Sequence, residues 1–278
     1  MLIFITSLKH PTTVASKPTM IRLLERTLST IEAQVNKDFR VIIVCHEIPE
    51  LSVSYSFVEY VLVDFPPPAR DFWDLAYTAE ADQDEKKREK RLELIKLDKG
   101  KKYLRGLYAA RKYNPSHVMF FDADDCLSPA ITETVLLGPT DQSWYVGNGY
   151  IYSEGSKWIV QRKNDFNTHC WTCYIFSMSV FWDLPENESD VPVEWYRDML
   201  GSHRMVYDWL ASKGIMMKKI PYPAVTYIIS SGENHSWLTG YGIWISRRGG
   251  IVRWIRFLLR MTSFRFLSDK IRQKFKLS

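Results

Sequence analysis

Three carboxylates follow a short apolar run near the middle of this 278-residue chain. Val118 to Phe121 has the length and composition of a buried strand, and Asp122, Asp124 and Asp125 come directly after it. Carboxylates so close together repel one another unless a cation lies among them, and their hard oxygens suit Mg²⁺ or Mn²⁺ that also binds phosphate groups. The motif therefore predicts a metal and diphosphate site. A solvated turn, or the cap of a helix beginning at Ser128-Pro129, is the alternative interpretation.

The elements that position this motif follow a βαβ pattern. Apolar runs typical of strands occupy residues 2–6, 39–44 and 60–63, and a helix with apolar residues at helical spacing is expected after the first. The pattern predicts a parallel sheet with right-handed crossovers. Because ligands bind beyond the carboxyl ends of such strands, we expect four residues at the ends of the first two strands to join the site: Thr6, Ser7, His46 and Glu47.

A charged stretch from Glu80 to Lys102 separates the third strand from the acidic motif. Such a stretch usually forms a solvated helix or loop with many charge pairs, so we interpret it as an insertion. A helix is expected over residues 103–113. Basic side chains and a helix start beside a phosphate site would help to neutralise a diphosphate, which makes Asp98 and Lys102 candidate binding residues.

Four segments together resemble the nucleotide-sugar glycosyltransferases with the GT-A fold, most closely the family 2-like group. They are Ile3-Phe-Ile-Thr-Ser7, Leu28-Ser-Thr-Ile-Glu-Ala-Gln34, Phe39-Arg-Val-Ile-Ile-Val44 and Phe120-Phe-Asp-Ala-Asp-Asp125, which cover roughly the first half of the chain in the family's order. The resemblance implies an α/β fold with a Rossmann-like, mostly parallel sheet flanked by helices, and a nucleotide-sugar donor across the strand ends. It also implies that Asp122 lies near the ribose and that Asp124 binds Mn²⁺ or Mg²⁺.

Members of that family commonly carry an Asp or Glu pair at the start of a later helix, one of which deprotonates the acceptor. The matching helix is expected over residues 202–214, where the pair reads Ser202-His203 and Ser202 is a good N-cap. A histidine in the first helical turn would be kept neutral by the helix dipole, as a base requires. His203 is therefore the candidate base, with Asp208 and Asp198 behind it; a capping or acid-binding role for His203 is the alternative.

A late loop follows a strand expected over residues 222–230 and contains His235 and Trp237. Related enzymes often place a late histidine on the catalytic metal, so the resemblance implies that His235 joins Asp124 as a metal ligand. Trp237 is a candidate for stacking on a sugar of the acceptor or donor.

The segment Cys170-Trp-Thr-Cys173 has the spacing of half a zinc site but lacks a second pair of ligands, which argues against a structural zinc. It lies where related enzymes recognise donor and acceptor. Trp171 and Thr172 are therefore candidate acceptor-site residues.

The C-terminal segment, residues 247–278, holds ten Lys or Arg residues and one acidic residue, Asp269, interleaved with apolar side chains. A basic amphipathic segment of this kind is typical of a helix that lies on anionic lipid. A helix packed on the domain with a solvated basic face is the alternative. Because the net charge of +5 is concentrated in this segment, the rest of the chain does not read as a nucleic-acid binder.

We expect three regions: a nucleotide-sugar-binding half (1–125), an acceptor and catalytic half of the same domain (126–246) and the basic amphipathic C-terminal segment (247–278). Four cysteines without a leader sequence, and no apolar run of about 20 residues, predict a cytoplasmic protein. It would lie peripherally on the inner face of the cytoplasmic membrane if the C-terminal segment binds lipid.

The function that these features predict is a metal-dependent, hexosyltransferase-like glycosyltransferase. It would move a sugar from a nucleotide-diphosphate donor to a glycan, lipid-linked or small-molecule acceptor. A noncatalytic, membrane-associated nucleotide-sugar binder is the first alternative, because the expected carboxylate pair is missing. An Asp-x-Asp phosphohydrolase is the second, although that motif usually opens its chain and continues to Thr or Val, unlike Asp125-Cys126 here.

Overall fold

The apolar runs of the first half form parallel strands in this computed structural model, which describes residues 1–66, 85–229 and 263–277. The parallel pairs run in the order β4-β1-β2-β3, with bounds β1 Leu2–Ser7, β2 Phe39–Cys45, β3 Val58–Leu62 and β4 His117–Phe120. Strand β3 begins two residues before its predicted start. The predicted βαβ pattern and its parallel sheet are confirmed.

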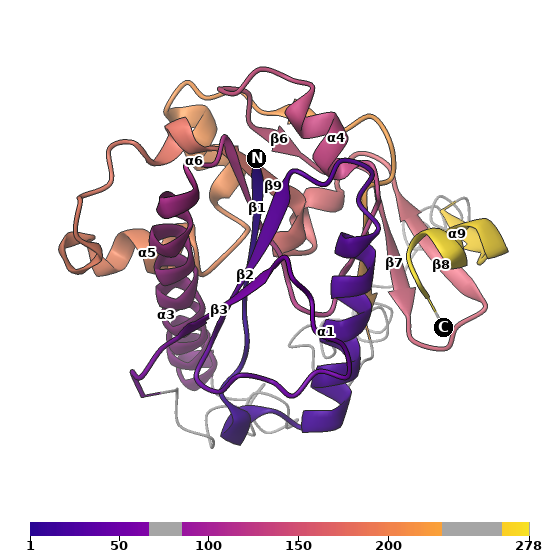
Figure 1. The fold of residues 1–278 in the computed structure, drawn as a ribbon, viewed down its shortest axis with the longest axis horizontal. Helices are drawn as coiled ribbons and strands as arrows, with labels where there is room; N and C mark the ends of the chain where they lie inside the picture. Colours follow the sequence, from indigo (N-terminus) through magenta and orange to yellow (C-terminus); the bar gives the residue numbers. More distant parts are fainter. Residues whose placement is uncertain (67–84, 230–262, 278) are drawn as a thin grey trace.

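Three short strands extend this sheet beyond β4: β9 Tyr174–Ser177, β6 Trp144–Tyr145 and β10 Lys218–Lys219. Strand β9 is antiparallel to both β4 and β6, whereas β10 is parallel to β6. The seven-stranded sheet is therefore mostly, but not wholly, parallel. Figure 1 shows α1 and α3 on opposite sides of β1, β2 and β3, which explains why both faces of these strands are apolar.

Helix α1 (Lys17–Glu32) begins at Ser16, whose Oγ accepts a hydrogen bond from the Thr19 backbone N–H at 3.3 Å. Its predicted apolar stripe packs on the sheet, with Leu24, Leu28 and Ile31 fully buried. The helix thereby fixes the segment that leads from β1 back to β2.

Helix α3 runs from Glu85 to Ala110, so the helix predicted over residues 103–113 begins much earlier. The charged stretch is rich in Glu, Lys, Arg and Leu, which are good helix formers, and it continues one helix rather than ending in a loop. Asp98 and Lys102 consequently lie inside α3. The predicted helix start beside the phosphate site does not exist.

Two glycines allow α3 to approach α5 (Val193–Met199) closely. A Cβ on Gly100 would lie 2.1 Å from the Tyr196 carbonyl oxygen, and one on Gly201 would lie 2.2 Å from the Lys96 carbonyl oxygen. Only glycine fits such a backbone contact. Lys99 is next to Gly100 and His203 is two residues after Gly201, and the two side chains lie close enough for the Lys99 charge to act on His203.

A second, five-stranded sheet was not predicted. Its order is β12-β8-β7-β11-β5, with bounds β5 Cys126–Leu127, β7 Gly149–Ser153, β8 Trp158–Arg162, β11 Val225–Ile229 and β12 Phe264–Phe266. Because β5 follows Asp125 directly, the acidic residues join two sheets and do not cap the short helix α4 (Ile131–Leu136). The strand predicted over residues 222–230 corresponds to β11.

The described end of the C-terminal segment packs on this second sheet. Strand β12 pairs with β8, and helix α9 (Asp269–Lys274) is followed by Phe275, which is completely buried against Tyr150. Residues 263–277 are therefore part of the fold and not a continuous interfacial helix, which corrects the prediction for this part. Figure 1 shows β7, β8 and α9 together beside the main sheet.

Helix α6 (Val206–Ser212) is shorter than the helix predicted over residues 202–214. Met205 is its N-cap, so Ser202 does not cap it and His203 lies in the preceding turn. Short 3₁₀ helices complete the connections: η1 Pro11–Thr13, η4 Arg111–Tyr113, η5 Phe166–Thr168, η6 Trp171–Cys173, η7 Met178–Phe181 and η8 Glu188–Asp190. No helix within the described ranges is long and apolar enough to cross a bilayer.

Candidate active site

Asp122 follows the carboxyl end of β4 and forms three hydrogen bonds. Its Oδ1 accepts a hydrogen bond from the Lys99 ammonium at 2.5 Å, its Oδ2 accepts one from the Trp171 backbone N–H at 3.2 Å, and its own N–H donates to Thr172 Oγ1 at 2.9 Å. Burial by itself would favour the neutral acid. The attraction and hydrogen bond of Lys99 outweigh it and hold the pKa of Asp122 below its usual value.

Asp125 is completely buried and fixes the loop from the inside. One carboxyl oxygen is hydrogen-bonded to the Thr172 hydroxyl, and the other accepts the Ile228 backbone N–H at 3.3 Å. Burial, followed by repulsion from Asp124 and Asp122, raises the pKa of Asp125 well above its usual value. Its carboxyl group is therefore a structural link between η6 and β11, not an open ligand.

Asp124 is the member of the motif that remains available. It is partly exposed, and no side chain within the described part of the chain donates a hydrogen bond to its carboxylate. Burial, together with repulsion from Asp122, raises the pKa of Asp124 to about 7, although Lys9 and Lys99 oppose the shift. A carboxylate with this environment fits a metal ion, because a bound cation would remove the repulsion that keeps it protonated.

The described residues supply an incomplete metal site. Among them, no group of three or more His, Cys, Asp or Glu side chains is arranged to hold a metal ion. Asp124 would need ligands from elsewhere, such as diphosphate oxygens, and the predicted ligand His235 lies outside the described residues, as does Trp237. Cys170 and Cys173 are free thiols with 3.4 Å between their sulfurs and do not form a zinc site with other described residues.

His203 lies close enough to Asp122 for each group to shift the pKa of the other. Its Nε2 is 3.0 Å from the Thr168 carbonyl oxygen, which can only accept, so Nε2 carries the proton and Nδ1 has the free lone pair. Burial lowers the pKa of His203 to about 4, although the Thr168 carbonyl and Asp122 oppose the shift. The imidazole is therefore neutral at pH 7, through burial and not through the predicted helix dipole.

The other two candidate bases do not share this environment in the described contacts. Both oxygens of Asp198 accept hydrogen bonds from Arg197, at 2.9 and 2.8 Å, and these bonds lower the pKa of Asp198. Asp208 is exposed on α6, and its charge acts on Tyr174. Neither contact connects them with the acidic motif.

Trp171 and Thr172 lie at the site, where they support the acidic motif. Both side chains are completely buried, and the Trp171 ring packs against Tyr103 and Phe120 at centroid distances of 5.8 and 5.5 Å. A buried side chain offers no surface to an acceptor in this conformation. Their contacts instead hold the backbone that carries Asp122 and Asp125.

Thr6 and Ser7 lie at the end of β1, next to the acidic motif. The Thr6 hydroxyl donates to the Phe121 carbonyl oxygen at 2.7 Å and is completely buried, so it braces the motif from the neighbouring strand. Ser7 is half-buried and bonds to Tyr103.

A polar cluster of His10, His46, Asp98 and Lys102 lies beyond the ends of β1 and β2. The rings of His10 and His46 are 4.7 Å apart, and the buried Lys102 ammonium donates to Asp98 at 2.8 Å and to the Leu8 carbonyl oxygen at 3.0 Å. His46 Nδ1 and Asp98 Oδ1 are buried and have no hydrogen-bond partner among the described residues. Buried polar atoms of this kind are normally satisfied by a ligand or water. Glu47, in contrast, pairs with Lys17 on the surface.

Two basic residues at the site were missed by the sequence reasoning. Lys99 lies between the predicted binding residues Asp98 and Lys102, and its position four residues before Tyr103 indicates a shared helical face. Arg26 on α1 is only 9% exposed and pairs with Glu154 at 2.9 Å, while its Nε and Nη2 have no partner in the described structure. Arg26 lies near enough to Asp124 for the carboxylate to raise the pKa of the guanidinium.

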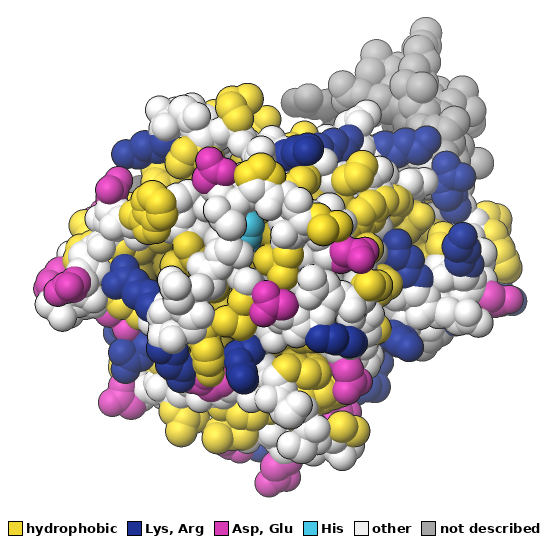
Figure 2. All heavy atoms as spheres, turned by 45° about the horizontal axis from the view of Figure 1, so that its top comes forward, with side chains coloured by type: hydrophobic (Ala, Val, Ile, Leu, Met, Phe, Trp, Pro, Cys, Tyr) yellow, Lys and Arg dark blue, Asp and Glu magenta, His cyan; other side chains and the backbone are white. Residues whose placement is uncertain are grey.

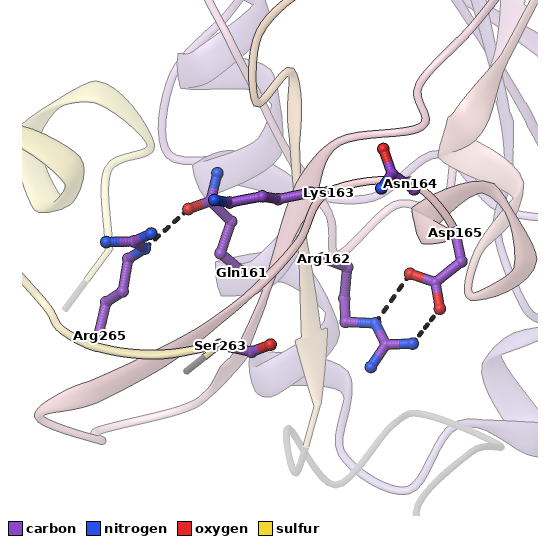
Figure 3. Close-up of a pocket in the computed structure, with 7 residues that line it drawn as sticks. All are labelled: Gln161, Arg162, Lys163, Asn164, Asp165, Ser263 and Arg265. Atoms are coloured by element: carbon purple, nitrogen blue, oxygen red, sulfur yellow. Dashed lines mark hydrogen bonds and ion pairs between the residues drawn. The ribbon is translucent and has the colours of Figure 1, made fainter. Parts of the chain in front are cut away.

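A pocket elsewhere, between β8 and the segment before β12, has a volume of about 440 Å³ and does not include the acidic motif. Figure 3 shows that Arg162 is paired with Asp165 there and that Arg265 is bonded to Gln161, while the Lys163 side chain is drawn without a partner. The pocket is basic and open. Its position beside the second sheet separates it from the candidate active site.

Comparison with known proteins gives little further information. No protein-family model and no curated sequence matches the chain. Among solved structures, S. aureus TarS is similar over 97% of this chain with a TM-score of 0.40 and 9% sequence identity. The chain spans 44% of the TarS chain, and a similarity of this degree assigns it neither a family nor an activity.

Proposed function

We propose that this protein is a metal-dependent glycosyltransferase that uses a nucleotide-diphosphate sugar. The observation that carries the proposal is that the three carboxylates of the acidic motif lie in different environments. Asp125 is buried as a link, Asp122 is paired with Lys99, and Asp124 stays partly exposed with a pKa of about 7. This arrangement, at the carboxyl ends of parallel strands, suits a divalent cation and an anionic ligand.

The residues around the motif support a donor site. Asp124 would hold Mn²⁺ or Mg²⁺, whose charge would stabilise the departing nucleoside diphosphate. Lys99 lies beside Asp122 and would supply further positive charge to the diphosphate. Asp122 accepts hydrogen bonds with both oxygens in the free protein, and one of these bonds would be exchanged for a bond from a ribose hydroxyl of the donor.

This polar cluster of His10, His46, Asp98 and Lys102 is the proposed place for the nucleobase. Among the described residues, His46 Nδ1 and Asp98 Oδ1 have no hydrogen-bond partner. His46 Nε2 donates to the Phe65 carbonyl oxygen at 2.7 Å, so both unpartnered atoms are acceptors that would bind the N–H donors of a base edge. The Thr6 and Lys102 side chains already donate hydrogen bonds to backbone carbonyl oxygens, so we expect them to support the site and not to contact the ligand.

His203 is the proposed general base for the acceptor hydroxyl. Its Nδ1 can accept the proton, while the Thr168 carbonyl keeps Nε2–H oriented and the Asp122 charge stabilises the resulting imidazolium. A base on the acceptor side favours inversion at the sugar carbon. Asp198 and Asp208 are the second choices, and the acceptor can be a glycan, a lipid-linked molecule or a small molecule.

The low pKa of His203 also favours the alternative, a noncatalytic nucleotide-sugar binder. A ring whose conjugate acid has a pKa of about 4 is a weak proton acceptor at neutral pH. A bound diphosphate would raise this pKa by its negative charge, which restores the base in the donor complex.

A thermal-shift screen of UDP, GDP, CMP and dTDP compounds with Mn²⁺ tests the proposal first, since a ligand that binds the folded state raises its stability. We expect one nucleotide class to raise the melting temperature only when Mn²⁺ is present. The matching nucleotide sugars are then assayed for turnover with glycan and lipid-linked acceptors. Binding without turnover by any acceptor would favour the noncatalytic alternative, and no nucleotide effect at all would contradict the donor site.

A further inference from the structure

The pocket of about 440 Å³ lies at the end of β8, beside the segment that leads into β12. Ligand sites for small molecules commonly have a volume of this order. The described residues that line the pocket are all polar or charged. Because three of them are basic (Arg162, Lys163 and Arg265) and one is acidic (Asp165), we call it the basic pocket.

Two of the basic residues carry charges that are not compensated. Arg162 is paired with both oxygens of Asp165, so these two charges cancel. Within the described part of the chain, neither Lys163 nor Arg265 pairs with a carboxylate, and Arg265 uses only its Nε, which donates to Gln161 Oε1 at 2.7 Å. Two positive charges match a phosphate monoester, which carries about −1.5 to −2 at pH 7, better than a carboxylate with a single charge.

The two uncompensated side chains are directed to the same place. Arg265 lies opposite Ile159 in the antiparallel β8–β12 pair, and Gln161, two residues farther along β8, is on the same face as Ile159. Figure 3 shows the Lys163 and Arg265 side chains both directed toward the amide group of Gln161. The pocket can therefore present an ammonium and a guanidinium to one anionic group.

Hydrogen bonds fix this part of the pocket before a ligand binds. The Gln161 amide is oriented because its Nε2 donates to Asn148 Oδ1 at 3.1 Å. Lys219 Nζ donates to the Lys163 carbonyl oxygen at 2.7 Å and to Asn164 Oδ1 at 2.9 Å, and these bonds hold the turn that follows β8. A site that is ordered in advance loses less conformational entropy when it binds.

The polar lining suits a sugar better than a nucleobase or an acyl chain. In the described contacts, Asn164 Nδ2 and Ser263 Oγ have no partner, and both can bond to hydroxyl groups. The described lining residues include no aromatic ring on which a base could stack and no apolar side chain for a lipid tail. Figure 2 shows Lys and Arg side chains gathered on the right-hand part of the molecule, where Figure 1 shows β8 and α9, and this charge would attract an anion.

We infer that the basic pocket binds the phosphate group of a phosphorylated carbohydrate. The Lys163 ammonium and the Arg265 guanidinium bind the phosphate oxygens, and Asn164 and Ser263 bond to the hydroxyl groups of the sugar. This binding does not require that the protein transfers sugars.

The position of the pocket indicates what the carbohydrate is for. Asp165 is the N-cap of η5, and Thr168 at the end of η5 holds Nε2 of the proposed base His203 at 3.0 Å. Three residues of a 3₁₀ helix span only about 6 Å. If the proposed function is right, the phosphorylated carbohydrate is therefore on the acceptor side of the site.

Titration calorimetry of the full-length protein with glucose 6-phosphate tests the inference, in excess chelator and without nucleotide. Glucose and inorganic phosphate are titrated for comparison. We expect glucose 6-phosphate to bind more tightly than inorganic phosphate, no binding of glucose, and a loss of at least about tenfold in Lys163→Gln/Arg265→Gln. Lys270→Gln/Lys276→Gln is the matched control and should bind like the wild type, since it removes the same charge from two exposed lysines outside the pocket.

Four results would overturn the inference. They are the absence of glucose 6-phosphate binding, equal affinities in the wild type and Lys163→Gln/Arg265→Gln, equal losses in the two double variants, and equal affinities for glucose 6-phosphate and inorganic phosphate. Displacement of glucose 6-phosphate by a nucleoside diphosphate with Mn²⁺ would also overturn it, because the probe would then occupy the donor site. Since the titration contains neither a nucleotide nor a transfer step, failure of the proposed function would leave its expected result unchanged.

Discussion

The ammonium of Lys99 lies 2.5 Å from Oδ1 of Asp122, across the gap between helix α3 and the end of β4. This ion pair neutralises one carboxylate of the acidic motif from within the protein. It leaves Asp124 as the carboxylate whose charge is not matched by a bonded side chain in the described residues. An added cation would therefore favour the state in which both carboxylates are ionised at neutral pH.

Lys99→Met should weaken nucleoside diphosphate binding by about 10- to 100-fold, because it removes a charge-assisted hydrogen bond and raises the pKa of Asp122. Titration calorimetry measures the affinity. Lys112→Met is the matched control, since Lys112 makes a 2.6 Å ion pair with Glu59 at the opposite end of the sheet. Equal losses in the two variants would mean that Lys99 has no specific role.

Thr172→Val should lower the free energy of unfolding by about 1–3 kcal/mol, because it keeps the shape of the side chain but leaves the Asp122 N–H and the Asp125 carboxyl without their shared partner. Urea denaturation measures the change. Thr168→Val, at an exposed threonine, should be close to wild type. A stability equal to that of the control would contradict the supporting role of Thr172.

His203→Ala should slow sugar transfer by roughly 10² to 10⁴ and leave donor affinity nearly unchanged, as expected for removal of a positioned proton acceptor. Single-turnover kinetics and calorimetry separate the two effects. Asp208→Asn on the exposed face of α6 is the comparison. Loss of sugar transfer in Asp208→Asn, together with nearly wild-type transfer in His203→Ala, would assign the base to Asp208 on α6 instead.

The first half of the fold could be predicted because its signals are local. Leu24, Leu28 and Ile31 repeat at helical spacing, and the runs that end at Ser7 and Phe121 are long enough to fix strands. The start of α3 could not be predicted from charge patterning, since charged helix formers look alike in a loop and in a helix. Within the second sheet, β7 and β8 form a local antiparallel pair, whereas the pairing of β12 with β8 joins segments about a hundred residues apart and leaves no local signal.

The acidic motif could be located from the sequence, but the roles within it could not. Lys99 reaches Asp122, and Thr172 reaches Asp125, through contacts that depend on how α3 and η6 pack against β4. The position of His203 likewise depends on the close approach at Gly201, not on a helix start. The roles of the candidate residues in catalysis and binding remain predictions.

The contribution of Asp124 to stability in the absence of divalent metal should fall as pH rises from about 3.8 to about 7; the lowered pKa of His203 acts in the opposite direction, so the wild type is compared with Asp124→Asn. Asp124 has a folded pKa of about 7, above the usual value of 3.8, so the folded state binds this proton more tightly and loses stability as the pH rises. Asp124→Asn should flatten this dependence and should melt above the wild type at pH 8. A difference in melting temperature between wild type and Asp124→Asn that does not change with pH would show that the pKa of Asp124 is not raised.

The most direct test of the central claim is calorimetric titration of the preferred nucleoside diphosphate into wild type and Asp124→Asn, each in Mn²⁺ and in excess chelator. We expect binding to the wild type that requires Mn²⁺, and loss of that binding in Asp124→Asn, because the substitution removes a ligand charge without changing the side-chain volume. His235→Ala should cause a smaller loss. Unchanged Mn²⁺-dependent affinity in Asp124→Asn would contradict the assignment of the metal and diphosphate site to the acidic motif.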